Sequence, residues 1–249
     1  LVETNGDFES AVDVLRKKGQ KVAAKRGDNE AKEGVVFAEV QGGIGYILQL
    51  NCETDFVAKN PDFQSMVKSI MKVAMDEGVS SLENLMHISY NNKLTIAEKL
   101  TEQIGVIGEK LEISNFAKVE GPTVVSYNHP GNQLATLVAL NNASDIASDA
   151  GKQIAMQVAA MNPIALNKEG IDDTIISREL EIGKDLAIQE GKPAEMAAKI
   201  AQGRLGKFFK ENTLLSQSFI KDNKQTVEQF LTSTDPNLTV IEFKRFCLN

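Results

Sequence analysis

The chain repeats one order of elements. Two β-rich runs, Val35 to Val40 and Ile44 to Asn51, flank the glycine pair Gly42 and Gly43, as in a β-hairpin. An acidic turn and an amphipathic stretch follow, and the same order returns about ninety residues later around Gly131. A repeat of this kind restricts the chain to two related α+β subdomains.

A third β-rich run ends each repeat, Lys110 to Val119 in the first and Leu238 to Cys247 in the second. We therefore expect two three-stranded antiparallel sheets, each covered by helices on one face. The amphipathic stretches have apolar residues at three-to-four spacing, which predicts a helix with one buried face in each repeat. These faces hold Phe63, Met66, Val67, Ile70, Met71 and Ala74 in the first repeat, and Ile154, Val158 and Met161 in the second.

The second repeat carries an insertion before its last strand. Across residues 172–212 two amphipathic stretches flank Gly191 and Pro193, where glycine suits a helix end and proline a helix start. The pattern predicts an inserted antiparallel helical hairpin. It either packs as an ordinary structural element or protrudes, and its narrow apolar seam beside charged residues favours protrusion.

The first residues predict a helix that begins after Asp7 and ends near Gly19, with Phe8, Ala11, Val12 and Leu15 on one face. One helix cannot bury its own apolar stripe, so it packs either on a missing part of the protein or on the next domain. The predicted division is a remnant N-terminal helical domain over 1–20, a linker over 21–34, a core subdomain over 35–122, and a second core subdomain over 123–249 that includes the hairpin.

Charge and apolar content exclude several classes of protein. A net charge of −7 argues against direct nucleic-acid binding, and the densest basic segment, Arg16 to Arg26, is short and typical of a solvated helix end. The longest apolar runs are too short to span a membrane. The run Gly105 to Lys110 lacks the spacing of a phosphate-binding loop, so we expect no direct binding of nucleotide.

Cysteine and histidine are too few for a metal centre. Cys52 and Cys247 fit no metal spacing and suit a reducing compartment, and the chain has only two histidines, so we expect neither metal nor cofactor. An alternative is a thiol hydrolase that uses Cys52, His129 and Asp55. Against it, Cys52 occupies an inward-facing strand position. An acid–base pair of Glu53 and Asp55 is less favoured than two solvated turn residues.

Phe56 has two interpretations. It follows a turn and precedes the helix stop at Asn60 and Pro61, so it is either the first core residue of the next helix or an exposed aromatic wedge for a partner. Asp55 beside it either caps a helix or repels phosphate or metal-binding groups of that partner.

Four segments resemble the elongation factor Ts family. The strongest is NCETDFVAKN, Asn51 to Asn60, and IAMQVAAMNP, Ile154 to Pro163, resembles the motif of the family's second subdomain. Gly191 to Phe219 resembles the return of its helical hairpin, and Thr4 to Gly19 looks like the last helix of its small ubiquitin-associated-type N-terminal domain. The four segments cover essentially the whole chain in order. The resemblance therefore implies a member of the family that is truncated at its N-terminus.

The resemblance implies a non-enzymatic guanine-nucleotide exchange factor that binds elongation factor Tu and promotes release of its GDP, in a bacterial cytoplasm or an organelle matrix. In the family an Asp-Phe pair, here Asp55 and Phe56, intrudes near the partner's magnesium and switch region. The second subdomain holds another domain of the partner. The residues implied to bind the partner are Thr54, Asp55, Phe56, Val57, Leu134, Ala135, Gln157 and Ile220.

Three departures from the family pattern concern the second contact. Gln157 stands where the family commonly has His, Gln133-Leu134-Ala135 where it has Arg-Ile-Gly, and Gln217-Ser218-Phe219 lacks the usual proline. They motivate an alternative, a partner-binding scaffold that has kept the fold but lost exchange activity. The exchange hypothesis predicts that Phe56 is exposed to solvent.

Overall fold

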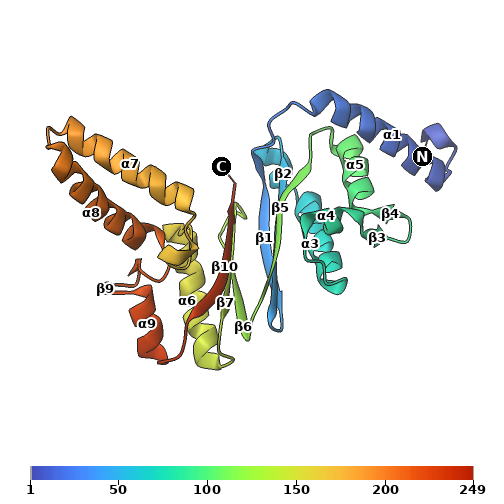
Figure 1. Ribbon diagram of the computed structural model, residues 1–249. Helices are drawn as coiled ribbons and strands as arrows, with labels where there is room; N and C mark the ends of the chain where they lie inside the picture. Colours follow the sequence, from blue (N-terminus) through green and yellow to red (C-terminus); the bar gives the residue numbers. More distant parts are fainter. Residues whose placement is uncertain (1, 249) are drawn as a thin grey trace. The chain divides into compact units, whose positions relative to one another are not determined.

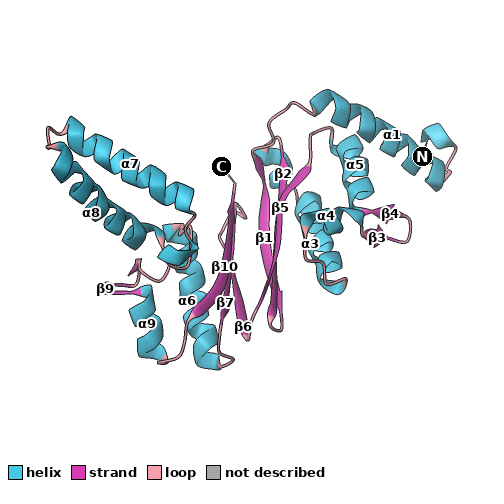
Figure 2. Cartoon of the chain, viewed as in Figure 1, coloured by secondary structure: helices cyan, strands magenta, loops and turns pink. Residues whose placement is uncertain are grey.

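A computed structural model of the chain describes residues 2–248, with residues 2, 8 and 9 described by their backbone alone (Figure 1). Contacts divide the chain into two compact units. Unit 1 holds the residues up to Glu120, Val124–Leu137 and the residues from Lys244 on, and unit 2 holds Gly121–Thr123 and Val138–Phe243. Helices and small antiparallel sheets make up the chain (Figure 2), which confirms the predicted α+β class. The predicted division into four parts stays a prediction.

The first sheet has the order β1-β2-β5, formed by β1 (Glu33–Gln41), β2 (Ile44–Cys52) and β5 (Glu112–Glu120). Both pairings are antiparallel, and β1 pairs with β2 without interruption from Glu33 opposite Cys52 to Gln41 opposite Ile44. The turn at Gly42 has a φ of +63°, a conformation that glycine adopts without strain. The predicted hairpin is confirmed.

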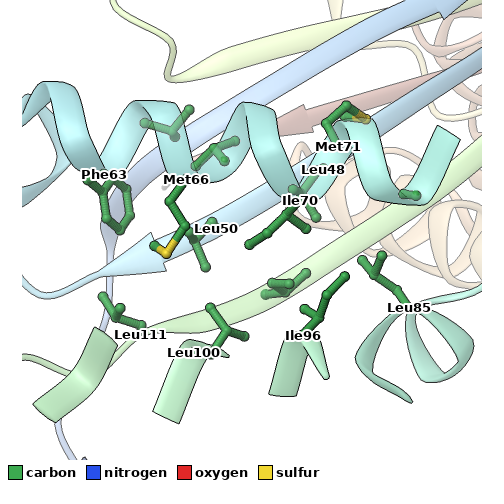
Figure 3. Close-up of a cluster of buried hydrophobic side chains, with 14 of the residues drawn as sticks. Leu48, Leu50, Phe63, Met66, Ile70, Met71, Leu85, Ile96, Leu100 and Leu111 are labelled. Atoms are coloured by element: carbon green, nitrogen blue, oxygen red, sulfur yellow. The ribbon is translucent and has the colours of Figure 1, made fainter. Parts of the chain in front are cut away.

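The helices of the first half of the chain lie on one side of this sheet, as Figure 1 shows for α3, α4 and α5. The other elements up to Glu120 are η1 (Val2–Thr4), α1 (Phe8–Arg26), α2 (Asp55–Ala58), α3 (Pro61–Asp76), α4 (Leu82–His87), β3 (Ser89–Asn91), β4 (Leu94–Thr95) and α5 (Ile96–Ile107). The six residues predicted for the inner face of α3 are all buried. Figure 3 shows Phe63, Met66 and Ile70 of α3 directed toward Ile96 and Leu100 of α5. Each such buried side chain contributes roughly 1.5–3 kcal/mol.

Helix α1 does not end near Gly19, as we predicted, but continues to Arg26. Gly19 is buried because the backbones of α1 and α5 touch there: a Cβ at Gly19 would lie 1.9 Å from the carbonyl oxygen of Thr101, and one at Gly105 would lie 2.5 Å from that of Leu15. Glycine therefore marks a helix crossing at this position and not a helix stop. Of the two predicted alternatives, α1 packs on the part of the chain that follows it.

The second sheet has the order β10-β7-β6, formed by β6 (Thr123–Asn128), β7 (Leu134–Leu140) and β10 (Val240–Cys247). The turn between β6 and β7 contains Gly131 and Asn132, which have φ values of +94° and +57°. Glycine and asparagine are the residues that tolerate this left-handed region best. The two predicted three-stranded sheets are therefore present.

Unit 2 contains α6 (Asp145–Met161), η2 (Lys168–Gly170), α7 (Asp173–Gln189), α8 (Ala194–Asn212), β8 (Ser218–Phe219), β9 (Asp222–Thr226) and α9 (Val227–Thr234). Ile154 and Val158 of α6 are buried as predicted, but Met161 is 43% exposed. The reason is the helix end: Asn162 takes a left-handed conformation directly after Met161, so the chain turns away there.

Helices α7 and α8 form the predicted hairpin, which leads away from α6 and α9 (Figure 1). Its seam consists of small buried residues, and a Cβ at Gly183 would lie 3.1 Å from the Cα of Ala201. Because the helices approach so closely, larger side chains do not fit between them. Ile182, Leu186 and Met196, at 41–55% exposure, lie partly in solvent.

Candidate partner interface

The candidate interface in unit 1 is the turn from β2 into α2. Thr54 caps α2, and its side-chain oxygen accepts the backbone N–H of Val57 at 3.4 Å. Asn60 caps the next helix, and its side-chain oxygen accepts the N–H of Asp62 at 2.8 Å. Two caps six residues apart confine α2 to a single turn, which places Phe56 at a corner of the chain.

The side chain of Phe56 is 83% exposed, the largest value for any large hydrophobic side chain in the part of the chain that the structure describes. The interpretation of Phe56 as a first core residue is therefore wrong. In contrast, its neighbour Val57 packs against the core. An exposed phenylalanine on a capped turn has the form of an anchor that a partner buries.

A charged pair lies beside Phe56. The carboxylate of Asp55 accepts a hydrogen bond from the ammonium group of Lys59 at 2.6 Å, which lowers the pKa of Asp55 and raises that of Lys59. Both groups are well exposed, so the pair contributes little to stability. A small cavity of about 210 Å³ opens next to it, lined by Glu33, Gly34, Asp55, Ala58, Lys59, Gln64, Gly131 and Gln133.

The turn before Phe56 is held by Glu109, which lies just after α5. One carboxylate oxygen of Glu109 accepts the backbone N–H groups of Glu53 and Thr54, both at 3.1 Å. The other accepts the hydroxyl of Thr54 at 2.7 Å. Gly108, in a left-handed conformation with a φ of +82°, ends α5 and turns the chain at this point. We did not predict a role for Glu109, because no local pattern relates it to a turn 55 residues earlier.

The carboxylate of Glu53 makes the reverse contact. It accepts the backbone N–H of Lys110 at 2.6 Å, and its other oxygen accepts from the guanidinium of Arg26 at 2.6 Å and the amide of Asn29 at 3.0 Å. Partial burial raises the pKa of Glu53, but these donors outweigh it and hold the pKa below its usual value. Arg26, at the end of α1, is thus connected to the turn that carries Phe56.

Cys52 lies beneath this turn and is fully buried. Burial, and secondarily the charge of Glu109, raises the pKa of the thiol to about 12, and the thiol donates to the carbonyl oxygen of Thr54 at 3.2 Å. A buried thiol of this kind stays protonated at neutral pH and is a poor nucleophile. His129, the base in the thiol-hydrolase alternative, has its ring nitrogen Nδ1 2.9 Å from the hydroxyl of Tyr127. The burial of Cys52 therefore contradicts the thiol-hydrolase alternative.

The four other predicted site residues differ in exposure. On β7, Leu134 is half-buried and Ala135 is fully buried. In unit 2, Ile220 is 43% exposed and Gln157 is fully buried. Ala135 and Gln157 therefore offer a partner no side-chain surface.

Gln157 and Ile220 are joined directly. The side-chain oxygen of Gln157 accepts the N–H of Ile220 at 2.8 Å, and its amide group donates to Gln217 and to the carbonyl oxygen of Ser218, both at 3.1 Å. Gln217 is buried as well and donates to the carbonyl oxygens of Met161 and Glu211, at 3.2 and 2.9 Å. Next to Ile220, Phe219 stacks on Phe230 with ring centroids 4.2 Å apart. These hydrogen bonds and the ring contact fix the loop that carries Ile220.

Comparison with known proteins decides the family. A family model described as "Elongation factor TS" matches residues 53–249. The chain belongs to the elongation factor Ts family. Similar family members include elongation factor Ts of Christiangramia forsetii, 50% identical, that of Flavobacterium psychrophilum, 49% identical, and that of Porphyromonas gingivalis, 47% identical; each alignment covers all of this chain and 90% of the relative. Membership of the elongation factor Ts family implies a role in translation elongation and protein biosynthesis.

Within residues 2–248, no helix combines the length and apolar character needed to cross a membrane. In the same part of the chain, no three side chains of histidine, cysteine, aspartate or glutamate gather as metal ligands would.

Proposed function

We propose that this member of the elongation factor Ts family binds elongation factor Tu and promotes the release of its GDP, with Asp55 and Phe56 entering near the partner's magnesium and switch region. One observation carries this proposal. Phe56 is 83% exposed on a turn whose backbone is fixed by its own caps and by Glu109. An aromatic side chain in such a place contributes little to the core, and a partner pocket would bury it.

Exchange requires no covalent chemistry. A protein that binds the nucleotide-free partner more tightly than the GDP-bound partner must weaken GDP binding by the same factor. The negative charge of Asp55, held ionised by Lys59, suits repulsion of phosphate or competition for a cation in the partner. The chain itself needs neither nucleotide, metal nor cofactor for this activity, and it acts as no enzyme in the ordinary sense.

The predicted binding residues divide into two groups. Asp55, Phe56, Leu134 and Ile220 have exposed surface and are the candidates for direct contact. Thr54, Val57 and Gln157 hold members of the first group in place through a cap, core packing and a hydrogen bond, and Ala135 is buried next to Leu134. A second contact supplies binding energy that offsets the strain imposed at the first. The relatives named above are bacterial, which favours a bacterial cytoplasm over an organelle matrix.

The test is the release of a fluorescent GDP analogue from elongation factor Tu, with the unmodified chain and with Phe56→Ala. Loss of an anchor residue costs about 2 kcal/mol or more, so acceleration should fall roughly thirtyfold or more. Val106→Ala is a matched control, since Val106 is also an exposed apolar residue of unit 1, at 54%. Equal rates for the unmodified chain and Phe56→Ala would rule out the wedge.

The alternative is a scaffold that binds elongation factor Tu without accelerating release. The departure at Gln157 favours the scaffold, because this residue stands where the family commonly has His and its side chain is buried. The second contact with the partner is then altered. Equilibrium binding measured beside nucleotide release separates the two functions. Tight binding with unchanged release would establish the scaffold.

A further inference from the structure

The turn that carries Phe56 is fixed by two glutamates that bind each other's backbone. Glu109 accepts the N–H groups of Glu53 and Thr54, while Glu53 accepts the N–H of Lys110, the residue after Glu109. Each carboxylate thus satisfies backbone donors next to the other. Carboxylate acceptors make stronger hydrogen bonds to backbone N–H groups than neutral acceptors do, and a reciprocal pair fixes both segments at once.

The contact reaches Phe56 through Thr54. The hydroxyl of Thr54 donates to Glu109 and also accepts the N–H of Val57, so Glu109 sets the side-chain orientation of the residue that caps α2. Phe56 lies in that single turn and has almost no packing of its own. Its direction is therefore determined by the backbone that Glu109 holds.

Positive charge makes the arrangement tolerable. Two carboxylates at one turn repel each other, and the guanidinium of Arg26, which donates to Glu53 at 2.6 Å, offsets this repulsion. The ammonium group of Lys110 donates to the carbonyl oxygens of Gly27 and Asn29, at 2.9 and 3.3 Å. The segment after α1 is tied to the same place. The glutamate pair is thus a built feature of unit 1 and not a chance surface contact.

We propose that Glu109 is a positioning residue for nucleotide exchange: it acts through Thr54 to hold Phe56 in the direction that the partner requires. The inference rests on the proposed function and deepens it. Pre-organisation of an anchor in the free protein removes an ordering cost from binding. Loss of Glu109 should then lower the maximal rate of GDP release by a larger factor than it lowers the affinity of the whole chain for elongation factor Tu.

The test is a double-mutant cycle on release of a fluorescent GDP analogue from elongation factor Tu. Glu109→Ala removes all three hydrogen bonds and should slow release tenfold or more, whereas Glu109→Gln keeps the size of the side chain and should slow it less. In a Phe56→Ala background, Glu109→Ala should change the rate by less than twofold. Glu112→Ala is the matched control, since the Glu112 side chain is 55% exposed and pairs only loosely with Lys110, at 3.6 Å.

A readout on the free chain shows whether the turn has loosened. With Cys247→Ser as the parent, Cys52 is the remaining thiol and lies under the turn. Its alkylation should be faster in Glu109→Ala than in Glu109→Gln. Both variants remove the same charge next to the thiol, so the difference reports opening of the turn and not the change in thiol pKa. Glu109→Gln also serves where Glu109→Ala does not fold.

Each outcome of these experiments supports or overturns the positioning role of Glu109. Slower release that disappears in the Phe56→Ala background, with faster alkylation, supports the positioning role. An equal loss in both backgrounds overturns it and indicates a general structural defect. Normal release with Glu109→Ala but slow release with Phe56→Ala overturns the inference and leaves the proposed function intact. Normal release with Phe56→Ala alone overturns the wedge, and with it the role of Glu109.

Discussion

Gln157 accepts the backbone N–H of Ile220 at 2.8 Å, so a fully buried amide on α6 fixes an exposed isoleucine 63 residues later. The same amide binds Gln217, which is itself buried. Burial of an amide costs free energy unless its donors and acceptors are paired, and here no buried side-chain nitrogen or oxygen of the described residues lacks a partner. The pair is a supporting element behind the surface that Ile220 provides.

Gln157→Ala should lower the free energy of unfolding by about 2–4 kcal/mol, because it removes the acceptor of the partly buried Ile220 N–H and leaves the side-chain oxygen of the buried Gln217 without this donor. Urea denaturation measures this. Gln153→Ala is the control, since Gln153 lies one turn earlier on α6 and is only half-buried. Equal losses from the two variants would contradict a special role for the buried amide.

Gly19→Ala and Gly105→Ala should each destabilise the docking of α1 on α5, by roughly 1–3 kcal/mol or more, because the added methyl group would overlap a backbone carbonyl. Hydrogen exchange of the α1 amides should show loss of protection before the rest of unit 1 changes. Gly27→Ala is a suitable comparison, since its Cβ would meet only an ordinary contact at 3.5 Å. Protection of α1 that survives in Gly19→Ala would show that the crossing is wider than described.

Gly203→Ala and Gly206→Ala should stabilise helix α8 by about 0.5–1 kcal/mol each, because a Cβ at either position meets open space and alanine loses less backbone entropy than glycine. Gly183→Ala, on the facing helix, should not stabilise, since its Cβ would lie 3.1–3.2 Å from Ala201. Thermal unfolding of the three variants makes the comparison. A rise in melting temperature for Gly183→Ala would indicate that the two helices can separate without cost.

Acid should weaken the chain partly through Glu53. The pKa of this carboxylate is lower in the folded chain than the ordinary value of 4.5, so as pH falls the unfolded chain binds the proton first. The stability that Glu53 contributes is complete above about pH 4.5 and is lost as pH falls through the folded-state pKa. In Glu53→Gln, the loss of stability below pH 4.5 should be shallower, measured as urea midpoints from pH 7 to pH 3. Arg26→Met should have a smaller effect in the same direction, since Arg26 is one of several donors.

The repeated strands and helices were predictable because their signals are local. The glycine turn at Gly42 and the three-to-four spacing from Phe63 to Ala74 depend on residues within one element, and both predictions are confirmed. Local signals also gave the inserted hairpin between Gly191 and Pro193. Where the fold follows from neighbours along the chain, the sequence alone is sufficient.

The sequence was misleading or left alternatives open where a distant segment determines the outcome. Gly19 has the pattern of a helix end, and only the carbonyl oxygen of Thr101, far along the chain, makes it a crossing. The exposure of Phe56 was open from sequence, since a phenylalanine after a turn suits the core as well as the surface. Gln157 stays buried because Gln217, sixty residues later, pairs with it. No pattern within a helix or turn contains that information.

The crossing of α1 and α5 also has a genetic consequence. The atoms that exclude a side chain at Gly19 and Gly105 are backbone carbonyl groups, of Thr101 and Leu15. Backbone atoms are the same in every amino acid, so no replacement at Thr101 or Leu15 can make room for a larger residue. A selection for suppressors of Gly19→Ala should therefore return the original glycine or changes that stabilise the chain elsewhere, and no compensating mutation in α5 itself.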